Sequence, residues 1–281
     1  MSVTGRLRAA VLMGHVVTAG AVGSAQSTQG RDLILATTTS VRDAGLLDTI
    51  LPEFERTQGR RVRVLAVGSG QAMELGRRGE ADLLILHDPA GEEAFVREGL
   101  GLDRRLLMHN EFIVVGPATD PARIRGLADP AAAFRAIAAR QATFVSRGDG
   151  SGTHVKERGI WSAAGTGPKG TWYLEAGQGM GQTLQIANEL RGYTLADIGT
   201  FLAHKSPLDL VVLVEGAPAL RNPYHVMLVN PARFPWIDAA GAVILHHYLL
   251  EPGTQRRIGA FGRARYGRSL FVPATDQPAG R

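Results

Sequence analysis

The sequence predicts an α/β protein made of two similar halves, with mostly parallel sheets flanked by helices. Short apolar runs, typical of buried strands, alternate with stretches in which apolar residues recur at helical spacing. This alternation ends at Pro117 and then begins again. The 281 residues include 44% hydrophobic side chains, which is enough for one or two domains with ordinary cores.

The first half repeats the order of a strand followed by a helix. Strands are expected at residues 33–36, 62–67, 82–86 and 111–115. The helix after the first strand has an apolar face around Ile50, and Gly59 is expected to end it. Pro89 is expected to begin a further helix, which Gly99 ends.

The second half follows the same order, after which the chain is expected to return to the first half. It is expected to hold strands at residues 143–145 and 210–214, and helices at 131–140, 181–191 and 194–204. A strand at 224–229 and a helix at 239–250 are expected to return to the first half. Boundaries near Gly116 and Pro223 predict two lobes, namely 31–115 with 225–281 as lobe 1 and 116–224 as lobe 2.

The N-terminus has the pattern of an export signal. Arg6 and Arg8 precede an apolar run at 9–22 that is too short to span a bilayer as a stable helix. Small residues follow, so a signal peptide over 1–25 is expected, and with it a periplasmic location. A disordered N-terminus or a poor membrane anchor is the alternative interpretation.

Composition excludes several classes of site. The chain has no cysteine, which excludes disulfides, thiolate metal sites, a cysteine nucleophile and a lipid-anchored cysteine. The formal net charge is +5, but Lys and Arg are scattered among acidic residues, so no nucleic-acid partner is expected. His246 and His247 are adjacent and would point in different directions on a helix, so no metal site or cofactor is expected.

Three predicted strands run into loops rich in Ser, Thr and Gly that begin helices, at residues 37–40, 68–70 and 146–153. The first turn of a helix has unpaired N–H groups and a partial positive charge, and hydroxyls add further donors. Ser and Thr are also ordinary helix caps, so a single loop says little. Three such loops, divided between two halves, favour a site for an anion.

Arg147 adds a permanent charge to the third loop. Asp149 lies two residues on, and we expect it to orient Arg147 or a backbone N–H instead of contacting an anion. Together, Asp149, Ser151 and His154 have the residue types of a hydrolase triad. Triads are usually assembled from separate segments, so a serine hydrolase is only a remote alternative and no enzyme activity is expected.

Six short stretches follow one another along the chain: Ala36-Thr-Thr-Thr-Ser40, Val67-Gly-Ser-Gly70, Ser146-Arg-Gly-Asp-Gly-Ser-Gly-Thr-His154, Gly177-Gln-Gly-Met-Gly181, Tyr193-Thr-Leu-Ala-Asp197 and Asn222-Pro-Tyr224. In this order they resemble the tungstate-binding proteins of ABC uptake systems. The third stretch is the most specific of the six. Three positions depart from the pattern of that family: Gly150 stands where a second acid is expected, Ile198 where a basic residue is common, and His225 where Gly is common.

The resemblance implies a type II periplasmic-binding-protein fold, with two α/β lobes and a ligand cleft between them. It implies that the ligand is a tetrahedral oxyanion, tungstate or molybdate, and that the partner is an ABC permease in the inner membrane. A monomer fits this role best. Phosphate or sulfate is the alternative ligand. The resemblance also implies the residues that line the cleft, which are Thr38, Thr39, Ser40, Ser69, Gly70, Arg147, Ser151, Gly152 and Thr153.

Overall fold

The computed structural model describes residue 1 and residues 31–276, so the predicted signal peptide at 1–25 lies almost entirely outside the described residues. The N-terminal elements are β1 (Leu33–Thr38), α1 (Thr39–Asp43), α2 (Leu46–Gln58), β2 (Val62–Val67), α3 (Ser69–Arg77), β3 (Leu83–Leu86), α4 (Pro89–Arg97) and β4 (Gly101–Gly116). The middle of the chain forms α5 (Pro130–Ala139), β5 (Phe144–Ser146), α6 (Gly152–Ala163), β6 (Tyr173–Glu175), α7 (Met180–Glu189), β7 (Thr194–Asp197), α8 (Ile198–His204) and β8 (Val211–Val214). The last elements are η1 (Pro218–Leu220), β9 (Arg221–Val229), α9 (Ala239–Leu250), α10 (Pro252–Ala260), α11 (Arg263–Tyr266), β10 (Val272–Pro273) and η2 (Ala274–Asp276).

Eight of the described strands form one mixed sheet, in the order β10-β4-β9-β3-β1-β2, with β7 and β8 also paired to β4. The predicted parallel pairing is confirmed where β1 lies between β2 and β3. The rest of the sheet is antiparallel where these strands meet: β9 runs antiparallel to both β3 and β4, and β7 and β8 run antiparallel to β4. A separate parallel pair is formed by β5 and β6.

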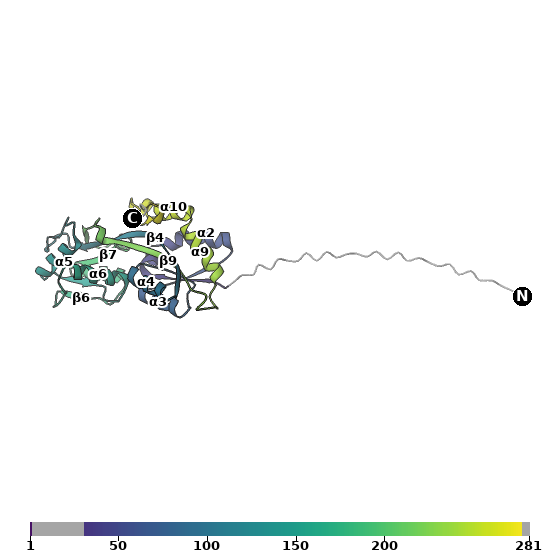
Figure 1. The fold of residues 1–281 in the computed structure, drawn as a ribbon. Coiled ribbons are helices and arrows are strands. Elements are labelled where there is room, and N and C mark those ends of the chain that lie inside the picture. The colour runs from purple at the N-terminus through teal and green to yellow at the C-terminus, as the bar shows by residue number, and fades with distance from the viewer. Residues whose placement is uncertain (2–30, 277–281) are drawn as a thin grey trace.

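The two long strands β4 and β9 lie side by side and connect the two ends of the molecule (Figure 1). One set of buried hydrophobic clusters draws its residues from 33–108 and 224–271, and a second set from 112–220. The described chain therefore has two cores, which confirms the two-lobed α/β fold class. We call them the lobe 1 core and the lobe 2 core. Both strands change core near the register pair Asn110 and Asn222, a few residues before the sequence-predicted boundary at Gly116.

The C-terminal helices pack on the lobe 1 core, as the sequence predicts. Leu245 and Leu249 of α9 are buried there with Leu33 of β1. The rings of Tyr248 and Phe54 lie 5.2 Å apart, and the Tyr248 hydroxyl donates to a backbone carbonyl of α2. This return of the chain holds the N-terminal strands and the C-terminal helices in one lobe.

Two parts of the sequence-based prediction are wrong at the level of elements. A helix was expected over 194–204, but Thr194 to Asp197 form β7, and α8 starts only at Ile198. All four β7 residues are buried and pair with β4, so sheet pairing overrides their helix-like spacing. The strand expected at 111–115 is the end of β4, which begins at Gly101. Among the residues that the structure describes, no helix is long and apolar enough to cross a membrane.

Candidate anion-binding site

The first and second predicted loops lie next to each other at one edge of the sheet. Thr38, at the end of β1, is in register with Val67 at the end of the parallel strand β2. Parallel strands that end together place the loops that follow them side by side. Ser69 therefore begins α3 beside the start of α1, and both loops lie at the carboxyl ends of the strands β1 and β2.

The first loop is largely buried. The Thr38 and Ser40 hydroxyls lie 3.0 Å apart, within hydrogen-bond distance. Thr39, between them, is half-buried. In the second loop the hydroxyl of Ser69 is buried and has no hydrogen-bond partner among the described residues, whereas Gly70 is exposed. Of these five predicted residues, Gly70 is therefore the one that the fold leaves at the surface.

The third loop is organised by Asp149. One oxygen of this carboxylate pairs with the Arg147 guanidinium, and the other accepts the backbone N–H of Ser151 at 3.0 Å. Burial alone would raise the pKa of Asp149, but the hydrogen bonds from Ser151 and the charge of Arg147 outweigh it and hold this pKa below its ordinary value. The sequence predicts that Asp149 orients Arg147 or a backbone N–H, and the structure contains both contacts.

Gly150 is explained by backbone geometry. Its φ is +69°, in the left-handed region that favours glycine, and its N–H donates to the Nδ1 atom of His154 at 3.0 Å. The same loop needs a second left-handed residue at Gly148, with φ +61°. The small residue at position 150 is thus required for the turn.

The third loop ends at the N-terminus of α6. The Ser151 hydroxyl caps this helix by accepting the backbone N–H of His154 at 3.4 Å. Gly152 and Thr153 follow in the first turn, and both are buried. The Thr153 hydroxyl finds no hydrogen-bond partner in the part of the chain that the structure describes.

A group of buried polar residues at the junction of the two lobes was missed from the sequence. Its members are His87, Asn110, Asp197, Asn222 and Tyr224. The Asn222 amide donates to Asn110 at 2.7 Å and to the Tyr224 hydroxyl at 3.0 Å, and its oxygen lies 2.9 Å from His87 Nδ1. Asp197 caps α8 by accepting the N–H of Thr200 at 2.8 Å, and burial raises the pKa of Asp197.

This junction group connects the first and third loops. A Cβ atom on Gly152 would lie 2.6 to 3.0 Å from three atoms of the His87 ring, so the start of α6 rests against that ring. Arg147 is close enough to act electrostatically on both His87 and Asp197. Ser40 of the first loop is close enough to act on the ionisation of the Tyr224 hydroxyl. Residues from both lobes therefore meet at one buried polar site.

Several buried polar atoms of this site have no hydrogen-bond partner within the described ranges. They are Ser69 Oγ, Asn110 Nδ2, Arg147 Nε, Thr153 Oγ1, Asp197 Oδ2 and Thr200 Oγ1. A buried polar group without a partner costs about 1–3 kcal/mol. All of these atoms except Asp197 Oδ2 can donate a hydrogen bond, and Arg147 adds a positive charge, which is the chemistry that a bound anion needs. Arg147, Ser69 and Thr153 are each at most 5% exposed.

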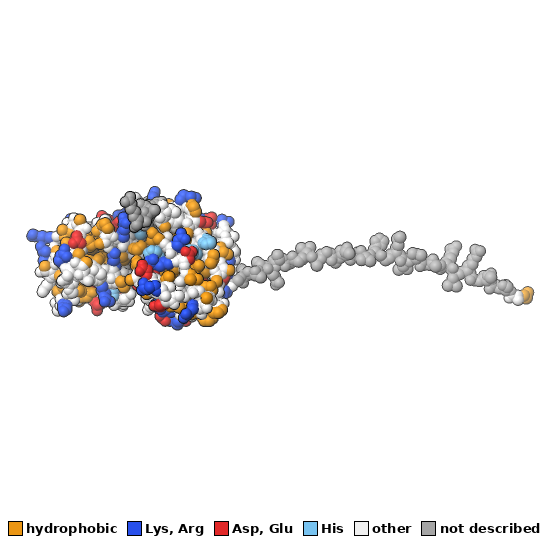
Figure 2. Space-filling view, in the orientation of Figure 1, with side chains coloured by type: hydrophobic (Ala, Val, Ile, Leu, Met, Phe, Trp, Pro, Cys, Tyr) orange, Lys and Arg blue, Asp and Glu red, His pale blue; other side chains and the backbone are white. Residues whose placement is uncertain are grey.

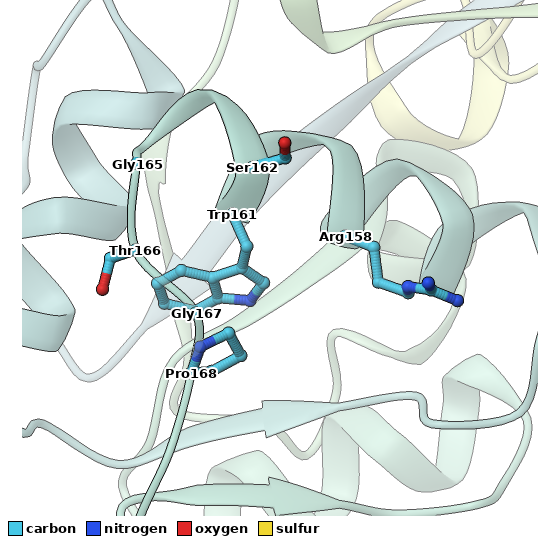
Figure 3. A pocket seen from close by; sticks show the side chains of 7 residues that line it. All are labelled: Arg158, Trp161, Ser162, Gly165, Thr166, Gly167 and Pro168. Carbon is cyan, nitrogen blue, oxygen red and sulfur yellow. The ribbon is translucent and has the colours of Figure 1, made fainter.

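The larger surface hollows lie elsewhere. Figure 3 shows one of about 420 Å³ at the C-terminal end of α6, where Trp161 lies beside Pro168. Another, of about 510 Å³, is lined by apolar residues of α5 and α6 together with the start of α4. Neither hollow is lined by a residue of the predicted site. A small one of about 100 Å³ reaches Gly152, His87 and Asn222.

The geometry gives no support to a hydrolase at Ser151. The Ser151 oxygen caps α6, the Nδ1 atom of His154 accepts from Gly150, and Asp149 is engaged by Arg147 and Ser151. No contact among the described residues places the His154 ring to take the Ser151 proton. The same residues contain no group of three or more His, Asp or Glu side chains that could hold a metal ion.

Comparisons with known proteins agree with this arrangement. The family model described as "PBP superfamily domain" matches residues 23–245. The "Tungstate-binding protein TupA" of Peptoclostridium acidaminophilum is 44% identical over 254 residues, which cover 89% of each chain. A crystal structure titled as the tungstate ABC transporter from Geobacter sulfurreducens is 45% identical with a TM-score of 0.76, covering 81% of this chain and 97% of that one.

A second solved structure, the tungstate-binding protein TupA from Desulfovibrio alaskensis, is 41% identical with a TM-score of 0.76. It covers 87% of this chain and 99% of its own. Two of these relatives are described as tungstate-binding proteins, and the matches cover 89% to 99% of the relatives' own chains. The chain therefore belongs to the family of tungstate-binding proteins of ABC transporters, within the PBP superfamily.

Proposed function

We propose that this chain is the extracytoplasmic substrate-binding component of an ABC transporter and that it captures tungstate, or the closely similar molybdate. The observation that carries this proposal is that Arg147, Ser69 and Thr153 are buried and that each has a side-chain donor without a hydrogen-bond partner among the described residues. Two relatives are named as tungstate-binding proteins, which supports the choice of ligand.

The chemistry of the ligand matches the chemistry of the site. Tungstate is a tetrahedral dianion, and burying a charge of this kind costs several kcal/mol unless its oxygens receive hydrogen bonds. Arg147 offers a charged donor, and the hydroxyls of Ser69 and Thr153 offer neutral ones. The proposed ligand-binding residues are those predicted from the sequence, with Gly70 and Gly152 contributing through the backbone.

The transport role rests on closure of the lobes. We propose the division 31–115 with 225–281 and 116–224, with the two long strands as the hinge. Closure around the ligand would bury the anion and create the surface that an inner-membrane permease recognises. A signal peptide at 1–25 and release of the mature chain into the periplasm as a monomer complete the proposal. On the face shown in Figure 2, basic side chains are dispersed among acidic ones, which favours a small anion over a nucleic acid.

Phosphate is the weaker alternative ligand. Phosphate carries a proton at neutral pH, and a carboxylate such as Asp149 would be the natural group to accept it. Both oxygens of Asp149 are instead engaged, one by Arg147 and one by Ser151. Sulfate carries no proton at neutral pH, so it remains the more informative competitor.

The experiment is a calorimetric titration of tungstate into wild type, Arg147→Ala and Arg78→Ala. Arg78 is a matched control, because it also pairs with an acid two residues on but lies at the surface. Removing a charged partner from a buried contact costs about 2–5 kcal/mol, so we expect Arg147→Ala to weaken tungstate binding at least about 30-fold. Equal affinity of Arg147→Ala and Arg78→Ala would overturn the role of Arg147.

A further inference from the structure

Among the buried polar atoms without a partner in the described chain, Asp197 Oδ2 is the only carboxyl oxygen. We propose that Asp197 binds the oxyanion in its protonated form, with the Oδ2–H group donating to an anion oxygen. Tungstate binding then takes up a proton from solution, and tungstate affinity falls as the pH rises. This inference rests on the proposed function and adds a ligand-binding residue to those predicted from the sequence.

Asp197 lies beside the third loop because two strands run in the same direction and end together. Phe144 of β5 and Tyr193, which directly precedes β7, form a parallel bridge. From there β5 continues to Ser146 and β7 to Asp197. Arg147 follows β5 directly, and its charge acts on Asp197. Asp197 is therefore at the carboxyl ends of the strands, which is where ligands of α/β sheets bind.

The fold gives Asp197 no countercharge. Its side chain is buried, and only Oδ1 has a partner, the N–H of Thr200 at 2.8 Å. Asp82 and Glu92 are buried to the same degree, but each pairs with an arginine, whereas Asp197 forms no ion pair among the described residues. The residue opposite Asp197 on β4 is Phe112, which carries no charge. A buried carboxylate in this position is costly, and burial accordingly raises the pKa of Asp197.

The arriving anion makes the proton more favourable still. Arg147 is already paired with Asp149, so an ionised Asp197 would leave these three side chains with a net negative charge before a dianion binds. A negative charge close by raises the pKa of a carboxyl group further. With its proton, Asp197 is neutral and its Oδ2–H group is a donor. Every unpartnered polar atom of the site can then donate to an oxyanion.

The other titratable groups near Asp197 leave a clear range of pH for the test. Burial lowers the pKa of His87 to about 4 and raises the pKa of Tyr224, and the pKa of Asp149 is held below its ordinary value. These three groups therefore keep one protonation state between about pH 7 and pH 9. His154 of the third loop is unchanged in a variant of Asp197, so comparison of the variant with wild type removes its contribution.

The test measures the tungstate affinity of wild type, Asp197→Asn and Asp129→Asn by calorimetry from about pH 7 to pH 9. Asparagine keeps the shape of aspartate, caps a helix equally well and donates through its amide, but it cannot ionise. Asp129 is the matched control, because it also caps a helix of lobe 2 but its side chain is 56% exposed.

We expect the wild-type association constant to fall by up to about tenfold per pH unit and that of Asp197→Asn to change much less. The variant should then bind tungstate more tightly than wild type at the upper end of the range, which damage to the fold would not produce. Asp129→Asn should follow the wild-type profile.

Proton uptake is also measured on wild type alone, so the inference does not depend on how the variant folds. The heat of tungstate binding is compared in HEPES and in Tris, whose ionisation enthalpies differ, and should show a net uptake of up to about one proton per anion. No net uptake across the range, or the same pH profile in wild type and Asp197→Asn, overturns the inference. Failure of the wild type to bind tungstate at any of these pH values would instead refute the proposed function.

Discussion

Replacing Gly152 by alanine tests whether the contact between the start of α6 and His87, which follows β3, matters for binding. A Cβ atom there would lie 2.6, 2.8 and 3.0 Å from three atoms of the His87 ring. These separations are shorter than ordinary van der Waals contact by several tenths of an ångström or more. The ring has little room to move, because Asn222 bonds it and the rings of Tyr224 and Phe112 flank it.

The size of the effect follows from that overlap. Adding a methyl group to a filled site costs about 1–3 kcal/mol, and about 2 kcal/mol corresponds to a factor of about 30 in affinity. His87 follows the lobe 1 strand β3 directly in the chain, whereas Gly152 begins the lobe 2 helix α6. The overlap opposes the approach of the two lobes, so we expect Gly152→Ala to weaken tungstate binding by about this factor.

The assay is calorimetry with tungstate, together with thermal unfolding without ligand. Gly159→Ala is the matched control on the same helix, since the added Cβ has no described heavy atom within 4 Å outside its chain neighbours and the adjacent backbone of its own helix. Alanine within a helix is favoured over glycine by about 0.5–1 kcal/mol, so this control should be slightly stabilised with wild-type affinity. Wild-type affinity in Gly152→Ala, or an equal loss in both variants, would refute the reasoning.

Two further predictions concern stability. Burial lowers the pKa of His87 to about 4 from an ordinary 6.5, so as the pH falls the unfolded chain takes up a proton before the folded one does. Urea unfolding should show wild type losing about 2 kcal/mol more than His87→Gln between about pH 7 and pH 5; parallel losses would contradict this. Asp82 is buried and accepts the N–H groups of Ile34 and Asp238, each at 2.8 Å. Asp82→Ala should lower the free energy of unfolding by about 3 kcal/mol, and a loss below about 1 kcal/mol would show that water replaces these bonds.

The parts of the fold that were predictable are those with a strong local signal. The strand β3 is apolar throughout and fully buried. The strand β1 begins with an apolar run, β2 is apolar except at Arg63, and both strands end in loops that begin helices. The first turn of α6 was also predictable, because a loop rich in Gly and Ser follows the strand β5 and Ser151 is a common helix cap. In these places local pattern and tertiary packing agree.

The parts that were missed depend on long-range pairing. The first ten residues of β4 include several charged and exposed positions, and their strand character comes from pairing with β9. Asn110 and Asn222 are brought together only by that register. His87 follows a strand end with no motif around it, so nothing local shows that its ring will meet Gly152. Asn222 and Tyr224 belong to one of the six stretches that resemble the tungstate-binding family. The hydrogen bond between their side chains is seen only in the structure.

The most direct test of the central claim is a calorimetric titration of the purified mature protein with tungstate, repeated with sulfate and with phosphate present in excess. A buried site built from Arg147 and hydroxyl donors predicts tight binding of tungstate that resists both competitors, and phosphate most strongly. Absence of heat with tungstate and molybdate, together with a clear response to phosphate or sulfate, would contradict the proposed ligand while leaving the fold intact.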